Sequence, residues 1–271
     1  MLKFFKTWTL PISMLAGAIG YFVFANVTFL EPTKPFMYTL IAYLTPFLIF
    51  AQLLLTFCKI SVRELMPSPW HGWLLLIQAV SSLVLAALLL WLPMREEYRD
   101  VFEGAMVCLI CPTATAAAGI TGKLGGSASS LTTYTLLSNL LAAIVVPLVF
   151  PLVEPHAEIT FFAAFLGKVF PLLLFPFFLA LFLRRFIPPI HRFLAGLRDM
   201  AFYLWAVALA IVTGQTVKSL VNSEAEIYVE ILIALGGLIT CIAQFYWGKR
   251  IGTKYNDRIS AGQALGQKNT V

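Results

Sequence analysis

Residues 108–129 read CLICPTATAAAGITGKLGGSAS, and this stretch interrupts a chain that is otherwise made of long apolar runs. It contains a proline, four glycines and several hydroxyl residues, which disfavour the interior of a helix. Pro112 lacks a backbone N–H group and disfavours the helical conformation at Cys111. In hydrocarbon, broken backbone is tolerated only where protein or a water-filled cavity satisfies its polar groups. The stretch therefore predicts a helix broken at Pro112, beside a polar cavity at membrane depth.

The rest of the chain has the composition of an integral membrane protein. Of its 271 residues, 60% are hydrophobic and 12% are charged. A helix that crosses the hydrocarbon needs about 20 apolar residues, and strand barrels need shorter, alternating segments. We therefore predict one all-α domain over residues 1–271, a polytopic membrane helix bundle. The predicted spans are 10–30, 37–58, 72–93, 102–124 (interrupted), 131–153, 159–183, 193–217 and 226–248.

Basic residues are unevenly distributed over the predicted loops. If the N-terminus is cytoplasmic, thirteen Lys and Arg residues lie at cytoplasmic ends of spans and four lie on the other side. This bias predicts a multi-pass protein of the cytoplasmic (inner) membrane with its N-terminus in the cytoplasm. Its net charge of +6 then indicates the lipid bilayer as partner and no nucleic acid. The first group is Lys3, Lys6, Lys59, Arg63, Lys123, Arg184, Arg185, Arg192, Arg198, Lys249, Arg250, Lys254 and Arg258, and the second is Lys34, Arg95, Arg99 and Lys218.

A second interrupted stretch, SAGQALGQKNTV at 260–271, stands where a ninth span is due. A lysine inside a membrane segment is unfavourable, and such residues normally face a site or a pathway. Interruptions in the fourth and ninth segments would be equivalent positions in two five-helix halves. Because five is odd, the halves would have opposite orientations, which is the inverted-repeat pattern of secondary transporters.

Both stretches resemble motifs of one family. CPTATAAAG at 111–119 resembles the crossing-helix signature of the bile acid:sodium symporter family, and SAGQALGQKN at 260–269 resembles its ninth helix. The resemblance implies ten helices, in which broken helices 4 and 9 cross and helix 10 is absent from these 271 residues. It implies a panel of helices at about 10–58 and 159–217 and a core at about 72–153 and 226–271. It also implies symport of organic anions with sodium.

The resemblance further implies roles for single residues. Thr115 and Asn269 would open the second halves of the broken helices, where unpaired N–H groups and the positive end of the helix dipole suit a carboxylate. The candidate substrate-binding residues are Thr113, Thr115, Lys268 and Asn269. The candidate ion-coupling residues are Gln78, Thr135, Gln263, Gln267 and Lys268.

Four positions depart from the family pattern. Ala117 and Ala118 replace a Ser-Asn pair of sodium ligands, Ala264 replaces a Glu, and Lys268 replaces a Gln. Sodium requires several oxygen ligands, and an ammonium 4 Å away would repel it by roughly 4 kcal/mol at an effective dielectric constant of about 20. No cofactor is indicated and sodium is disfavoured, so three hypotheses stay open: transport independent of sodium, transport coupled to protons through Lys268, and simple exchange. In a further alternative, Lys268 extends to the membrane surface or pairs with a carboxylate.

The leading prediction is thus a secondary transporter of a small or amphipathic organic anion. The alternative is a membrane protein of the same family that binds a ligand or partner without transporting it, which the lost sodium ligands favour. An intramembrane enzyme would need a nucleophile with a base, or paired carboxylates for a metal. Because the predicted spans hold almost no Asp, Glu or His, the sequence predicts no enzyme.

Cysteines and histidines indicate no further chemistry. Cys108 and Cys111 form a CxxC pair with no second pair and no nearby histidine, which favours packing over metal binding. His71, His156 and His191 occur singly near predicted span ends, so we predict solvated side chains.

Overall fold

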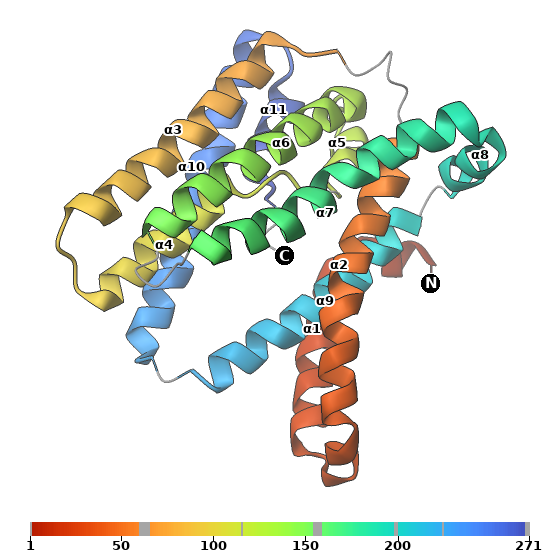
Figure 1. The fold of residues 1–271 in the computed structure, drawn as a ribbon. Helices are drawn as coiled ribbons and strands as arrows, with labels where there is room; N and C mark the ends of the chain where they lie inside the picture. Colours follow the sequence, from red (N-terminus) through yellow and green to blue (C-terminus); the bar gives the residue numbers. More distant parts are fainter. Residues whose placement is uncertain are drawn as a thin grey trace. The chain divides into compact units, whose positions relative to one another are not determined.

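The computed structural model describes residues 2–59, 66–114, 116–153, 159–197, 200–223 and 225–268. Throughout these ranges the regular structure is helical, apart from one isolated bridge, so the all-α prediction is confirmed (Figure 1). The helices are α1 (Leu2–Asn26), the 3₁₀ helix η1 (Thr28–Thr33), α2 (Lys34–Lys59), α3 (Pro69–Trp91), α4 (Glu96–Ile110), α5 (Ala117–Lys123), α6 (Ala128–Val153), α7 (Ile159–Phe186), α8 (Pro188–Gly196), α9 (Met200–Val221), α10 (Ile227–Lys254) and α11 (Arg258–Gly266).

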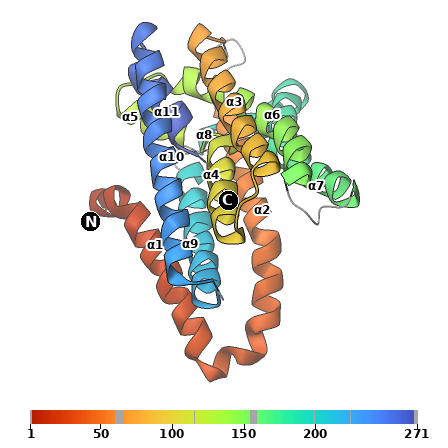
Figure 2. The same ribbon diagram turned by 90° about the vertical axis from the view of Figure 1, so that its left-hand side faces the viewer.

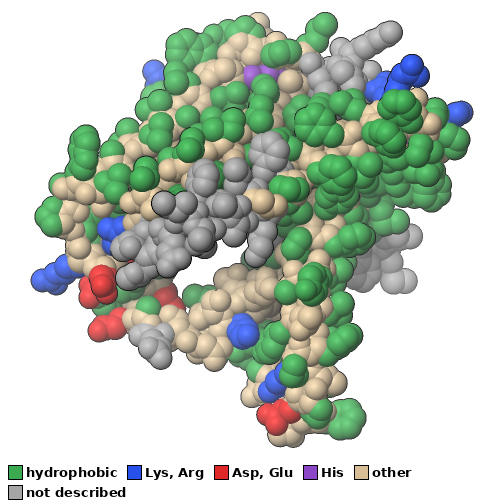
Figure 3. All heavy atoms as spheres, viewed as in Figure 1, with side chains coloured by type: hydrophobic (Ala, Val, Ile, Leu, Met, Phe, Trp, Pro, Cys, Tyr) green, Lys and Arg blue, Asp and Glu red, His purple; other side chains and the backbone are tan. Residues whose placement is uncertain are grey.

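By length and composition, six segments of the described chain are able to cross a membrane. They are Trp8–Asn26, Thr28–Lys59, Pro69–Trp91, Ala128–Val153, Met200–Val221 and Ile227–Lys254. Large apolar side chains stay exposed along them, as they do where a helix faces lipid (Figure 3). The prediction of a membrane helix bundle is confirmed at this level.

The predicted start of the seventh span is wrong. Instead of one helix that begins at Phe193, the chain forms the short helix α8, Pro188–Gly196, and starts α9 at Met200. Pro188 and Pro189 stand at the first positions of α8, where the missing N–H groups of proline leave no intrahelical hydrogen bond unmade. Gly196, Arg198 and Asp199 stand between the apolar residues of α8 and those of α9, and these residues are the sequence signal for the boundary.

The chain divides into two compact units. One contains Met1–Cys58 and Ala180–Glu224, and the other contains Lys59–Leu179 and Ala225–Thr270.

In the first unit, α1 and α9 pack against each other along their lengths (Figure 2). Gly17 on α1 faces the backbone of Ala210 on α9, and Gly214 lies one turn further along α9 with the carbonyl of Gly17 opposite. Small residues at intervals of four let two helix backbones approach closely, which is the usual basis of helix association in lipid.

Replacing Gly17 by Ala is expected to destabilise the first unit by about 1–3 kcal/mol, because the added methyl group meets the carbonyl of Ala210. Gly20→Ala, three residues along the same helix, adds its methyl group in open space and serves as the control. The measurement is the thermal midpoint of the purified protein in detergent. Equal midpoints for the two variants would contradict the close approach of α1 and α9.

In the second unit, α4 packs between α3 and α10, and α6 packs against α3. Helix α11 runs back along α10 and also contacts α3, α5 and α6 (Figure 2). The turn between α10 and α11 contains Asn256, whose φ of 57° is a left-handed conformation that Asn tolerates. This return brings the second interrupted stretch of the sequence alongside the first.

Candidate functional site

The fourth apolar segment is broken at the position predicted from the sequence. Helix α4 ends at Ile110 and α5 begins at Ala117, with Pro112 in the connecting residues. Cys111 has φ −49° and ψ 140°, the extended conformation that a following proline favours. The prediction of a helix broken at Pro112 is confirmed.

The broken backbone is satisfied by the second interrupted stretch. Thr113 and Lys268 form an isolated antiparallel bridge. The N–H group of Ala114 donates to the carbonyl oxygen of Gln267 at 2.9 Å, and the Thr113 hydroxyl donates to the carbonyl oxygen of Ala264 at 2.7 Å. Two segments far apart in sequence therefore supply each other's missing hydrogen bonds. We call residues 111–114 and 263–268 the junction.

Gln78 on α3 holds the broken end of α4. Its Nε2 donates to the carbonyl oxygens of Ile110 at 2.7 Å and Cys111 at 3.2 Å. Its Oε1 accepts from the hydroxyls of Tyr134 at 3.0 Å and Ser138 at 3.2 Å, both on α6. Because both N–H hydrogens and both lone pairs of the oxygen are in use, Gln78 caps α4 and presents no free oxygen to an ion in this arrangement.

Replacing Gln78 by Leu is expected to destabilise the protein by about 2–5 kcal/mol, since buried carbonyl and hydroxyl groups lose their partner. The thermal midpoint in detergent measures this loss. The matched control is Ser81→Ala on the same helix, because the Ser81 hydroxyl bonds only to the carbonyl of Gln78 within α3. A Gln78→Leu midpoint as high as that of the control would show that the cap is unimportant.

The other predicted ion-coupling residues lie in different surroundings. Thr135 is buried on α6, and its hydroxyl donates to the carbonyl oxygen of Leu131 one turn earlier at 3.0 Å. Gln263 on α11 is half-buried, and its Oε1 has no hydrogen-bond partner among the described residues. Gln267 contributes its backbone carbonyl to the junction. The structure thus places Gln263, Gln267 and Lys268 at the junction, while Gln78 and Thr135 are bonded within the helical frame.

Lys268 is the cation of the junction. Its Nζ is buried and has no hydrogen-bond partner in the described part of the chain. The thiols of Cys108 and Cys111 lie within electrostatic reach of it. A buried ammonium without an acceptor is unfavourable, so this position is suited to receiving an anion. Of the other predicted substrate-binding residues, Thr113 lies at the junction, and Thr115 and Asn269 fall outside the described residues.

Apolar side chains surround Ala117, Ala118 and Ala264. Ala117 and Ala264 are completely buried in a cluster that Ala118 packs against. Alanine has no side-chain oxygen, and the neighbouring side chains are mostly hydrocarbon, which is a poor environment for a hard cation. The buried members of the cluster are Trp70, Leu74, Ala117, Leu131, Tyr134, Ala261, Ala264 and Leu265.

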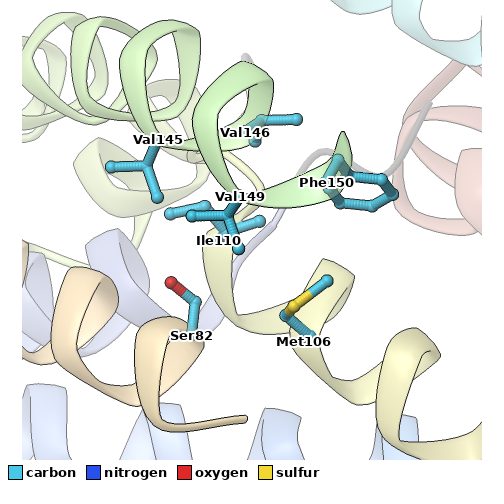
Figure 4. A pocket seen from close by; sticks show the side chains of 7 residues that line it. All are labelled: Ser82, Met106, Ile110, Val145, Val146, Val149 and Phe150. Atoms are coloured by element: carbon cyan, nitrogen blue, oxygen red, sulfur yellow. The ribbon is translucent and has the colours of Figure 1, made fainter. Parts of the chain in front are cut away.

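An apolar pocket lies beside the junction, between α3, α4 and α6 (Figure 4). It is a shallow gap that leaves no room for a water molecule, and Ile110, the last residue of α4, is one of its lining residues. Its one polar lining residue, Ser82, bonds to the carbonyl oxygen of Ala79 at 3.0 Å. The pocket thus suits hydrocarbon and is not the polar cavity that the sequence predicted. Its lining residues are Ser82, Met106, Ile110, Val145, Val146, Val149 and Phe150.

The prediction of a solvated His71 is wrong. Its side chain is only 1% exposed, its Nδ1 accepts the backbone N–H of Ser68 at 2.9 Å, and its Nε2 lies 3.1 Å from the Ser130 hydroxyl. Because Nδ1 acts as an acceptor, we assign the hydrogen of the neutral ring to Nε2, which then donates to Ser130. His71 therefore caps α3 and fastens it to α6, and it does not activate Ser130 as a base would. Ser68 three residues before His71 resembles a capping box, which is the sequence signal for this role.

His156 falls outside the described residues, whereas His191 on α8 is partly exposed. Among the described side chains, no three His, Cys, Asp or Glu residues lie close enough together to hold a metal ion.

No protein-family model matches this chain, and no curated protein matches it. The junction combines the buried Lys268 Nζ, which has no hydrogen-bond acceptor among the described residues, with paired backbone groups and apolar side chains next to them.

Proposed function

We propose that this chain is a secondary transporter of a small or amphipathic organic anion, with the substrate's carboxylate bound at the junction. The observation that carries the proposal is the buried Nζ of Lys268, which has no hydrogen-bond partner within the described residues. Ionisable groups at membrane depth are typical of substrate and ion pathways. Broken helices that meet at this depth are typical of transporter binding sites.

The proposal includes membership of the bile acid:sodium symporter family. In this interpretation α4 with α5, and α11 with the residues after it, are the crossing helices of two inverted five-helix repeats. The hydrogen bonds between Thr113, Ala114 and the end of α11 support it, because crossing helices meet where they unwind. The protein would then lie in the cytoplasmic membrane with its N-terminus in the cytoplasm, as its basic residues predict.

The apolar side chains beside the junction support an amphipathic substrate. Ile110 lines the pocket, and Thr113, three residues later, bonds to the end of α11. A carboxylate near Lys268 would therefore have an apolar surface close by for its hydrocarbon part. Ligand sites commonly combine an apolar lining with a few polar groups that fix orientation.

The proposed transport does not use sodium. The apolar packing of Ala117 and Ala264 supports this, as does the presence of a lysine where the family has a glutamine. Lys268 then provides as a fixed group the positive charge that sodium would bring. Either a proton travels with the anion by way of Lys268, or one anion exchanges for another.

The test is uptake by proteoliposomes of a panel of radiolabelled carboxylates, from bile acids to short keto acids. We expect uptake of at least one of them, at rates that stay the same when external sodium is replaced by potassium at constant ionic strength. A steep rise in uptake with external sodium would contradict the sodium-independent mechanism. A carboxylate that raises the thermal midpoint of the protein but never enters the vesicles would instead show that the protein binds its ligand without transporting it.

A further inference from the structure

The short helix α8 has an apolar face that is largely exposed. It follows α7 after the single residue Ile187, and none of its nine residues is buried. Nine helical residues rise about 14 Å, too short for a hydrocarbon layer of about 30 Å. Because the predicted span 159–183 ends just before it, α8 starts where the chain leaves the hydrocarbon.

The residues of α8 are arranged on two different faces. Ile190, Phe193 and Leu194 are spaced i, i+3 and i+4, which places them on one side of the helix. Arg192 lies on the opposite side. Phe193 is 68% exposed, Ile190 is 46% exposed and Leu194 is half-buried, so most of the apolar face is open. A short helix with this pattern is typical of the membrane interface, where its apolar face enters the acyl region.

Basic residues surround this helix. Arg184 and Arg185 lie in the last turn of α7, and Arg192 lies one turn into α8. Residues 184–197 contain no Asp or Glu, so this stretch does not neutralise its own charge. The Cζ atom of Arg185 also lies 5.9 Å from the ring centre of the exposed Phe186, so a guanidinium group and an apolar side chain are neighbours on the surface. Figure 3 shows basic and apolar side chains side by side at this end of the molecule.

We propose that residues 184–197 form an interfacial anchor that binds anionic phospholipid headgroups. Ile190, Phe193 and Leu194 enter the boundary between headgroups and acyl chains, and the arginines bind the lipid phosphates. Positive charge favours the anionic leaflet, which the distribution of basic residues predicts to be the cytoplasmic one. The anchor is separate from the junction and stands whether or not the protein transports an anion.

Hydrogen–deuterium exchange of the full chain in lipid nanodiscs tests this proposal, with the exchange rate read on peptides that cover residues 187–197. We expect slower exchange in an equal mixture of phosphatidylcholine and phosphatidylglycerol than in phosphatidylcholine alone. The variant Arg185→Gln with Arg192→Gln should lose about fivefold in protection for each arginine removed. Phe193→Ser should lose protection in both lipid compositions.

The matched control is Arg250→Gln, which replaces an exposed arginine near the C-terminal end of α10. It should leave the exchange of residues 187–197 unchanged. All substituted side chains are exposed, and an unchanged thermal midpoint checks that the variants fold. Equal exchange in the two lipid compositions would overturn the proposal, and so would an effect of the double variant no larger than that of Arg250→Gln. Protection that requires an added protein would assign the surface to a protein partner and overturn it as well.

Discussion

Replacing Lys268 by Met is expected to abolish anion binding while leaving the protein folded. The side chains have similar length, so the change removes the charge and little of the volume. Losing one partner of a buried charge pair typically costs about 2–4 kcal/mol, which is roughly 30- to 1,000-fold in Kd. The empty protein should be as stable as the wild type or more stable, because a buried ammonium without an acceptor has been removed.

Two measurements separate the effect on binding from an effect on folding. Calorimetric titration with the transported carboxylate gives Kd, and the thermal midpoint without ligand reports the fold. Lys268→Arg keeps the charge and should retain part of the affinity. Lys254→Met, at the exposed end of α10, is the matched control and should bind as the wild type does. Unchanged affinity in Lys268→Met would remove the basis of the proposed substrate site.

Replacing Gly248 by Leu is expected to detach α11 from α10. A Cβ at this position would lie 2.5 Å from the carbonyl oxygen of Ala261 and 3.0 Å from the Cα of Gly262, both in the backbone of α11. Backbone of a packed helix cannot move aside locally as a flexible side chain can, so we expect about 3 kcal/mol of destabilisation or more. Since the junction depends on α11, anion binding should be lost as well.

Cysteine labelling reports this detachment directly. The half-buried Cys241 thiol lies 3.9 Å from the carbonyl oxygen of Gly266, the last residue of α11. We expect a maleimide to react with Cys241 much faster in Gly248→Leu. Gly237→Ala on the same helix is the control, because its added methyl group makes an ordinary contact of 3.9 Å with the Cys108 sulfur. Equal labelling rates in the two variants would show that the tight approach of α10 and α11 is not required.

The sequence predicted the parts of the fold that depend on local chemistry. Long apolar runs predicted the membrane helices. Pro112 predicted the break, because its missing N–H group removes a hydrogen bond within its own helix, whatever the rest of the fold. Lys268 was found for a similar reason, since a lysine in an apolar context is unusual wherever it occurs. The boundary between α8 and α9 was missed although Gly196, Arg198 and Asp199 mark it, because hydropathy averaged over the length of a span hides so short an interruption.

Roles that depend on distant partners were not predicted. His71 owes its burial to Ser130 on another helix, 59 residues further along the chain. Gln78 caps carbonyls that lack helical partners because α4 breaks 32 residues later, a contact that the sequence alone does not show. In both cases the role of the side chain becomes evident only when the packing of the helices is known.

The contact between Thr113 and Ala264 also has a consequence for biosynthesis. The two residues are 151 positions apart, so the first broken segment must enter the membrane long before its partner has been made. At about 5–20 residues per second, this interval lasts on the order of 10 s. During that time the exposed backbone at Pro112 needs other partners, and water or the insertion machinery must supply them. Ribosome-bound chains halted before residue 260 would therefore be the species in which this segment is most readily misinserted or degraded.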